Sequence, residues 1–413
     1  MTSTLVVYLN EQKAGTLSDI GNAQISFEYH PDYLEHGGVA LSTSLPLSTT
    51  PFDDAKSRPF FSGLLPDDQQ LEGLAQHLKV SRRNVFKLLS EVGGECAGAV
   101  SLFASEQLAA ETSKKTQPPL SDEQLSQRLN TSKHRPLLGA DDSVRLSLAG
   151  AQSKLAVVIN GGKTFLSTPS SPSTHIIKPA SNTIEGLVEN EFICMSLAKA
   201  VGIDVPDIKL RKVGDQQVYQ IQRYDRVQNQ GFIKRIHQED FCQALGVVPE
   251  NKYQFEGGPS LDNCIQLIRQ VSSRPAVDYQ WLLERIIFNY LIGNNDAHAK
   301  NFSLIYSNGQ CRLAPAYDLV STAVYPELNA DMAMRIGGRK SANDVQPRHW
   351  LRLVPDNKTS KEFFRALLFS LCRDVELALD VKAVDLQTHK VGKKINDVLR
   401  RRIDRLKTLF EAK

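Results

Sequence analysis

The 413-residue sequence contains no apolar run that approaches the roughly 20 residues that a membrane-spanning helix needs. The apolar stretch at residues 5–9 is short, and it lacks the charged start and the small-residue cleavage site of a secretory signal. These absences argue against both a membrane protein and a secreted protein. We therefore expect a cytoplasmic protein that has no membrane partner.

Cysteine is scarce, and no two cysteines form a Cys-x-x-Cys pair. The six residues are Cys96, Cys194, Cys242, Cys264, Cys311 and Cys372. This scatter argues against a disulfide framework and against a cysteine-based zinc site. It is typical of small buried side chains in a reducing compartment.

Net charge is also small, at +3, and does not by itself indicate a nucleic-acid partner. Residues 390–413 differ, because nine Lys or Arg stand there against three Asp or Glu. A basic helix is most often a solvated surface, and contact with DNA phosphates is the second interpretation. The length and a hydrophobic content of 41% are enough for two or three compact units with a large core.

What the sequence does contain is a set of oxygen-bearing side chains around residue 300. Asp296 is followed five positions later by Asn301, and Asp318 comes further on. Protein kinases use the same Asp-x-x-x-x-Asn spacing, in which the aspartate orients the attacking hydroxyl while the asparagine and a second aspartate hold Mg²⁺. Asp and Asn after a helix are usually turn residues, so the spacing alone is a weak signal.

The flanks of this set have regular patterns. Residues 281–292 carry apolar side chains at helical spacing, and Gly293 follows them as glycine often follows a helix. Residues 301–306 alternate as a strand does, residues 307–310 are typical of a turn, and residues 311–313 fit a returning strand. We therefore expect the candidate ligands at the ends of regular elements.

Other stretches fit the binding of nucleotide phosphates. The small side chains at residues 149–152 would let backbone N–H groups approach phosphate oxygens. Lys178 ends a strand-like run and could reach the phosphates, steadied by Glu189 or Glu191. Residues 161–164 end like a Walker A loop, but Val157 stands where that motif needs glycine. A hairpin turn at residues 160–162 explains them better.

Six segments occur in an order that resembles the HipA family, the serine/threonine-kinase toxins of bacterial type II toxin–antitoxin pairs. They are residues 148–154 (LAGAQSK), 175–178 (HIIK), 190–192 (NEF), 238–243 (QEDFCQ), 296–303 (DAHAKNFS) and 315–319 (PAYDL). The similarity runs along essentially the whole chain. It implies an α+β, two-lobed, protein-kinase-like fold with a small N-terminal α/β subdomain and an all-helical C-terminal lobe.

The resemblance also implies domain boundaries. We expect an N-terminal subdomain over residues 1–110, a linker over 111–140, a kinase N-lobe with the phosphate-binding loop over 141–235, and a helical C-lobe over 236–413. Residues 319–343 would then be a substrate or activation-type loop that contains Gly337 and Gly338.

Site roles follow from the same resemblance. Asp296 would be the catalytic residue, Asn301 and Asp318 would hold Mg²⁺, Ser147 would be autophosphorylated, and Glu191 would support Lys178. The expected ATP-binding residues are Ala149, Gly150, Ala151, Gln152, Ser153, Lys154, Lys178, Gln222, Tyr224, His298 and Asn301. The family has Glu-Arg-Phe where this chain has Gln222-Arg223-Tyr224, which puts a side-chain contact of Gln222 with the nucleotide in doubt.

The implied partners are a small helix-turn-helix antitoxin of the HipB type, operator DNA through that complex, and a protein substrate such as glutamate–tRNA ligase. Arg400 and Arg401 are the candidate DNA contacts. Two other functions stay open, a kinase for a small molecule and a catalytically idle co-repressor. Phosphorylation of Ser147 would separate the first from a protein kinase, and any ATP-dependent activity would argue against the second.

Overall fold

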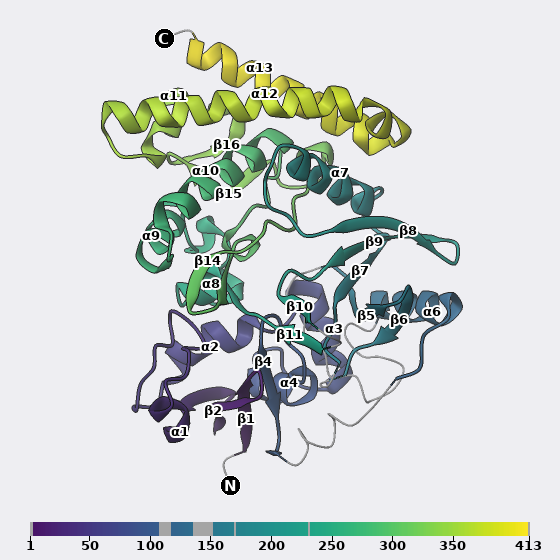
Figure 1. The fold of residues 1–413 in the computed structure, drawn as a ribbon, viewed down its shortest axis with the longest axis vertical. Helices are drawn as coiled ribbons and strands as arrows, with labels where there is room; N and C mark the ends of the chain where they lie inside the picture. The colour runs from purple at the N-terminus through teal and green to yellow at the C-terminus, as the bar shows by residue number, and fades with distance from the viewer. Residues whose placement is uncertain (1–2, 107–116, 135–151, 169–170, 230–231, 412–413) are drawn as a thin grey trace. The chain divides into compact units, whose positions relative to one another are not determined.

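A computed structural model describes residues 3–106, 117–134, 152–168, 171–229 and 232–411 (Figure 1). The chain divides into two compact units, and it passes from one to the other several times. The first unit contains residues 1–179, 211–250 and 304–309; the second contains residues 180–210, 251–303 and 310–413. None of the described helices is both long enough and apolar enough to span a membrane.

The first unit begins with a four-stranded antiparallel sheet in the order β3-β2-β1-β4. Its elements are β1 (Thr4–Leu9), β2 (Gln12–Gly21), β3 (Gln24–Tyr29) and β4 (Val100–Phe103), with α1 (Pro31–Glu35), α2 (Asp54–Gly63), α3 (Asp68–Leu78) and α4 (Val85–Val92). Strand residues alternate between buried and more exposed positions, as a sheet covered on one face requires. Phe27, Phe60 and Phe61 are buried in the core between sheet and helices.

A second sheet has five strands in the order β6-β5-β7-β9-β8. Its strands are β5 (Leu155–Asn160), β6 (Lys163–Leu166), β7 (His175–Pro179), β8 (Ile208–Val213) and β9 (Gln216–Gln222), and α6 (Asp122–His134) precedes them in the chain. Gly161 and Gly162 have positive φ and turn the chain between β5 and β6. The hairpin expected there is confirmed, and no Walker A loop exists at these residues.

The remaining described elements of the first unit are short. They are the antiparallel pair β10 (Arg226–Asn229) and β11 (Phe232–Arg235), then β12 (His237–Asp240), α8 (Phe241–Ala244) and most of β13 (Ser303–Ser307). Asp240 caps α8 by accepting a hydrogen bond from the N–H of Gln243 at 2.8 Å, and the Gln243 side chain accepts from the N–H of Asp240 at 2.9 Å.

The second unit is mainly helical but not entirely so. Its helices are α7 (Leu187–Ala200), α9 (Leu261–Val271), α10 (Pro275–Ile292), α11 (Pro347–Trp350), α12 (Lys358–Thr388) and α13 (Lys390–Glu411). Helices α12 and α13 lie side by side, and both contact α10 and α7 (Figure 1). The unit also contains the strands β14 (Gln310–Leu313), β15 (Asp331–Ile336) and β16 (Arg339–Ser341).

The expectation of an all-helical C-terminal lobe is therefore wrong. Residues 319–343, expected to be a loop, contain the antiparallel pair β15 and β16. In β15, Met332, Ala333, Met334 and Ile336 are buried and Arg335 is exposed, and Gly337 and Gly338 have positive φ at the turn. The mixed helix and sheet content of the fold is confirmed. The expected domain boundaries remain a prediction.

Candidate active site

The loop that carries Asp296 begins where α10 ends. Gly293 has φ of +76° and stops the helix there, as its position in the sequence predicted. The loop then runs from Asn294 to a short 3-10 turn at Ala299–Asn301. The Asp296 side chain lies at an exposed position on this loop, and Asn301 is half-buried. The Asp296 carboxylate is therefore accessible from solvent, which its expected role requires.

Asn294 connects this loop to the segment that carries Asp318. Its side-chain oxygen accepts a hydrogen bond from the N–H of Asp296 at 3.2 Å. Its amide nitrogen donates to the Asp318 carbonyl at 3.3 Å and to the Asn289 side chain at 2.8 Å. The buried side-chain amide of Asn294 thus connects the Asp296 loop to the Asp318 segment.

A second link runs through Tyr317, the neighbour of Asp318. The Tyr317 hydroxyl donates to the carbonyl of Lys300 at 2.7 Å and lies 2.6 Å from the hydroxyl of Ser303. Asp318 itself has φ of +51°, a left-handed conformation that is unfavourable for most residues but tolerated by Asp. Such backbone strain is often found at functional sites.

Two further side chains hold the residues around this junction. The Thr322 hydroxyl accepts from the N–H of Asn295 at 2.8 Å and donates to the carbonyl of Gly293 at 3.1 Å. In α7, the Asn190 side chain accepts from the N–H of Ser321 at 2.8 Å and donates to its carbonyl at 3.0 Å. The segment after Asp318 is therefore fixed on both sides.

Asn301 and Asp318 supply oxygen atoms of the kind that Mg²⁺ prefers. The Asn301 side-chain oxygen accepts one hydrogen bond, from the N–H of His298 at 3.1 Å, and an amide oxygen has a second lone pair. Among the described residues, no three His, Cys, Asp or Glu side chains gather as a metal site. One carboxylate and one amide oxygen still fit Mg²⁺, which is usually held by few protein ligands together with substrate phosphates.

Lys178, Gln222 and Tyr224, three of the expected ATP-binding residues, lie in the first unit. Lys178 is buried in β7 and is paired in register with Tyr219 of β9. Gln222, at the end of β9, is exposed, and the Tyr224 hydroxyl donates to the side chain of Gln238. Glu191 is buried in α7 of the second unit, so its pairing with Lys178 remains a prediction.

The expected phosphate-binding loop is described only in part. Ser147, Ala149, Gly150 and Ala151 lie outside the described residues, whereas Gln152, Ser153 and Lys154 lie within them at half-buried positions before β5. The Ser153 hydroxyl accepts a hydrogen bond from the Gln70 side chain of α3 at 3.2 Å. The roles of all these residues remain proposals.

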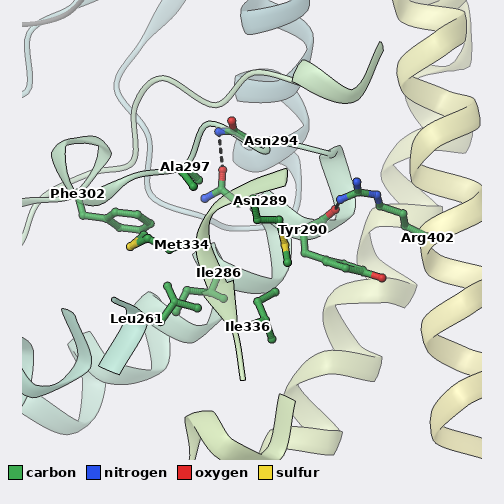
Figure 2. A pocket seen from close by; sticks show the side chains of 12 residues that line it. Leu261, Ile286, Asn289, Tyr290, Asn294, Ala297, Phe302, Met334, Ile336 and Arg402 are labelled. Atoms are coloured by element: carbon green, nitrogen blue, oxygen red, sulfur yellow. Dashed lines mark hydrogen bonds between the residues drawn. The ribbon is translucent and has the colours of Figure 1, made fainter. Parts of the chain in front are cut away.

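A small cavity in the second unit is lined in part by Asn294 and Ala297 of the loop that carries Asp296. Its volume is about 30 Å³, and Figure 2 shows Asn294 and Asn289 joined by their hydrogen bond at its edge. Apolar side chains form much of the remaining wall, among them Leu261, Ile286, Phe302, Met334 and Ile336. Such a volume holds about two water molecules, so this cavity is not a nucleotide site.

Several residues that shape the site were not identified from the sequence. Asn294 and Thr322 act through side-chain bonds to backbone atoms, which no spacing reveals. The Tyr253 hydroxyl donates to an Asp296 carboxylate oxygen at 2.9 Å, although Tyr253 lies 43 positions earlier in the chain. The irregular sequence around Tyr253 contains no motif that predicts this contact.

The basic residues of α13 differ in their surroundings. Arg402 and Arg405 donate to the carbonyls of Tyr290 and Asn343, so they have structural roles in the second unit. Arg400 and Arg401 are exposed, and Arg400 forms an ion pair with Asp380 of α12 at 3.1 Å. Whether either contacts DNA remains a proposal.

Comparison with known proteins finds relatives that cover most of the chain. Residues 5–103 match the HipA N-terminal domain, and residues 146–379 match the HipA-like C-terminal domain. The Sinorhizobium fredii protein Y4mE is 42% identical over 351 residues, which cover 84% of each chain. The serine/threonine-protein kinase toxin HipA of Shewanella oneidensis is 31% identical over 83% of this chain and 81% of its own.

A solved structure agrees with these matches. The Shewanella oneidensis MR-1 HipA, in a complex with HipB and its operator DNA, superimposes with a TM-score of 0.84 at 27% identity and covers 97% of both chains. Domain matches, relatives and fold all agree with the expected resemblance. The chain belongs to the HipA family.

Proposed function

We propose that this chain is an ATP-dependent serine/threonine protein kinase that acts as the toxin of a HipA/HipB-type toxin–antitoxin pair. The observation that carries the proposal is the bridge made by Asn294, which ties the Asp296 loop to the Asp318 segment. A set of one exposed carboxylate, an amide oxygen and a second carboxylate suits phosphoryl transfer. Membership of the HipA family and the named kinase activity of the Shewanella relative support the same reaction.

In the proposed reaction, Asp296 orients the serine or threonine hydroxyl and accepts its proton. Asn301 and Asp318 would hold Mg²⁺, which when bound neutralises phosphate charge. Lys178 would offset the charge of the α- and β-phosphates, and residues 149–154 would contact phosphate oxygens through backbone N–H groups. Gln222 and Tyr224 would border the adenine, and His298 would support the catalytic loop.

The direct test replaces Asp296 by Asn, which keeps the shape of the side chain and removes the base. Turnover is expected to fall by about 10²–10⁴-fold, because that is the usual contribution of a positioned general base. Asp262→Asn, at an exposed position in the first turn of α9, is the matched control and should leave turnover unchanged. Wild-type turnover by Asp296→Asn would refute the assignment.

We propose that Ser147 is autophosphorylated and that the modification inactivates the enzyme. A phosphate adds about two negative charges beside the loop expected to bind ATP phosphates, and like charges would repel the nucleotide. Mass spectrometry of the purified chain after incubation with ATP should detect phosphoserine at Ser147. A kinase restricted to small molecules would have no reason to carry this mark, so its absence would favour that alternative.

The proposed substrate is a component of translation such as glutamate–tRNA ligase. Incubation with labelled ATP and a cell lysate, followed by identification of the labelled protein, tests it. Labelling of glutamate–tRNA ligase would support the proposal, and labelling of another protein would replace that substrate while leaving the kinase assignment intact. A complete lack of ATP-dependent activity would favour an idle co-repressor.

We further propose that the chain binds a HipB-type helix-turn-helix antitoxin and, through it, operator DNA. Arg401 is exposed, whereas Asp380 partly neutralises Arg400. Contacts with DNA phosphates release counterions, so Arg401→Ala should reduce the slope of log affinity against log salt by about 1, and Arg400→Ala by less. Unchanged slopes for both variants in the complex would exclude these residues from the DNA contact.

A further inference from the structure

Residues 251–258 bring an aromatic hydroxyl to the catalytic loop. The Tyr253 hydroxyl donates a hydrogen bond to Oδ1 of Asp296 at 2.9 Å. Both residues belong to the second unit. The contact therefore lies on the carboxylate that the proposed function treats as the base, and the inference below rests on that proposed function.

The backbone of this segment is held tightly. The Tyr253 carbonyl accepts hydrogen bonds from the N–H of Glu256 at 3.0 Å and of Gly258 at 2.9 Å. The Gln254 side chain accepts from the N–H of Arg335 in β15 at 2.7 Å. A Cβ at Gly258 would lie 2.0 Å from the Asn251 carbonyl oxygen and 2.7 Å from that of Tyr253, so only glycine allows this compact turn.

The ring of Tyr253 is held separately from its hydroxyl. It stacks on Phe255 with centroids 5.4 Å apart, and it meets the ring of His298 edge to face at 5.3 Å. The Lys252 ammonium lies 5.4 Å from the centroid of the Tyr253 ring. Since these contacts use the ring alone, Tyr253→Phe removes the hydroxyl and retains the packing.

We propose that Tyr253 is a positioning residue that fixes the Asp296 carboxylate for proton acceptance. A hydrogen bond on Oδ1 restricts the rotation of the carboxylate. In the transfer step, the substrate hydroxyl oxygen forms a bond to the γ-phosphorus while its proton passes to the Asp296 carboxylate. The bond from the γ-phosphorus to ADP breaks, and its electron pair leaves with the ADP oxygen. The donated hydrogen bond also stabilises the ionised form that can accept the proton.

The test compares the wild type, Tyr253→Phe and a matched control, Tyr279→Phe. Tyr279 donates to the Leu353 carbonyl at 2.6 Å, so the control also loses a hydrogen bond from a tyrosine hydroxyl, here to a backbone carbonyl elsewhere in the second unit. Steady-state release of labelled γ-phosphate from ATP, to protein or to water, is measured from acid to neutral pH and across ATP concentrations.

For Tyr253→Phe, kcat should fall by about 10-fold, because a hydrogen bond to a charged group is lost. The KM for ATP should stay constant, and the acidic limb of the pH profile should move up by about one unit. The other ionisable groups on the contacting segments, Lys252, Glu256, His298, Lys300 and Asp318, are the same in both proteins. A shift of the acidic limb between the wild type and Tyr253→Phe is therefore due to the loss of the Tyr253 hydroxyl.

Gly258→Ala supplies a second route, because the added Cβ displaces the turn that carries Tyr253. It should lower kcat in the same way without altering Tyr253 itself. Wild-type kcat and pH profile in Tyr253→Phe would overturn the inference while the proposed function stands, as would a fall in kcat with an unmoved acidic limb. A wild-type chain that transfers no γ-phosphate at all would overturn the proposed function instead.

Discussion

The side chain of Asn294 makes three hydrogen bonds, each to a different part of the second unit. It accepts from Asp296, donates to the carbonyl of Asp318, and donates to the side chain of Asn289 in α10. Asn294 is itself buried. No other natural side chain of this length combines one acceptor with two donors. Its replacement should therefore affect catalysis and stability together.

Asn294→Ala is expected to lower kcat by at least about 10-fold, because both aspartate-bearing segments lose a common anchor. The free energy of unfolding should fall by about 1–3 kcal/mol, since the Asn289 side-chain oxygen and the Asp318 carbonyl each lose a donor. Labelled-phosphate turnover at saturating ATP and urea unfolding monitored by fluorescence measure the two effects.

Asn343→Ala is the matched control, because the Asn343 side chain is exposed and the backbone contacts of that residue survive the substitution. Asn343→Ala should change neither kcat nor the free energy of unfolding. If Asn294→Ala were as active as the wild type, the bridge would be a structural feature with no part in the reaction.

At this scale, the sequence indicates candidate residues but not the side chains that position them. Asp296, Asn301 and Asp318 are candidates because phosphoryl transfer requires particular oxygen ligands, and their roles remain predictions. Asn294, Thr322 and Tyr253 act through contacts that depend on tertiary structure. Hydrogen bonds of this kind leave no periodic pattern in the chain.

Among the elements, the end of α10 determines where the loop that carries Asp296 starts. Gly293 has φ of +76°, and a Cβ there would lie 2.7 Å from Cβ of Ala323 and 3.0 Å from Cγ1 of Val398. Both the conformation and the close approach therefore require glycine. The neighbouring backbone also depends on this position, because the Gly293 carbonyl accepts from Thr322 and from the N–H of Ala323.

Gly293→Ala should lower the free energy of unfolding by about 1–2 kcal/mol through its left-handed conformation, and by about 1–3 kcal/mol more through the contacts with Ala323 and Val398. Gly202→Ala is the control, because Gly202 follows α7 with φ of +83° and has open space around its Cβ position. Gly202→Ala should therefore lose only the stability that comes from the left-handed conformation. Equal losses of stability in urea unfolding would mean that the close packing around Gly293 has no energetic consequence.

The elements differ in how well their patterns predicted them. Residues 281–292 form the end of α10. The strand expected over residues 301–306 is present as β13 but begins at Ser303, and the strand expected over residues 311–313 is present as β14. The pair β15 and β16 was missed because two adjacent glycines favoured a loop interpretation. Those glycines instead supply the two positive φ angles that a tight hairpin turn needs.

At the scale of the whole molecule, the first unit is assembled from three separate stretches of chain, which local patterns do not predict. A largely buried ionic cluster joins two of these stretches. It contains two buried carboxylates, Glu95 and Asp225, two buried guanidiniums, Arg223 and Arg226, and the half-buried guanidinium of Arg235. Arg223 contacts Asp225 at 2.7 Å and Glu95 at 3.4 Å, and Arg226 contacts Glu95 at 3.3 Å.

The ionisation of the cluster follows from these contacts. Burial raises the pKa of Glu95, but Arg226, Arg223 and Arg235, with a hydrogen bond from Ser173, outweigh burial and leave the pKa below its usual value of 4.5. Burial lowers the pKa of Arg226 to about 10, with repulsion from Arg223 acting in the same direction. Three guanidiniums therefore face two ionised carboxylates, and each carboxylate is needed to offset the repulsion between the guanidiniums.

Glu95→Gln leaves one carboxylate against three guanidiniums, two of them buried, and at pH 7 it should lower the free energy of unfolding by about 3–5 kcal/mol. A carboxylate whose pKa is lowered by folding stabilises the protein above its unfolded pKa, and it loses that effect as the pH falls through the folded value. The free energy of unfolding should therefore differ most between the wild type and Glu95→Gln above pH 4.5, and the difference should shrink below that pH.

Urea unfolding between pH 7 and pH 3 measures this difference. Glu106→Gln, which breaks only the exposed ion pair with Lys13, is the control. A difference that stays constant with pH would show that Glu95 acts through packing rather than through its charge.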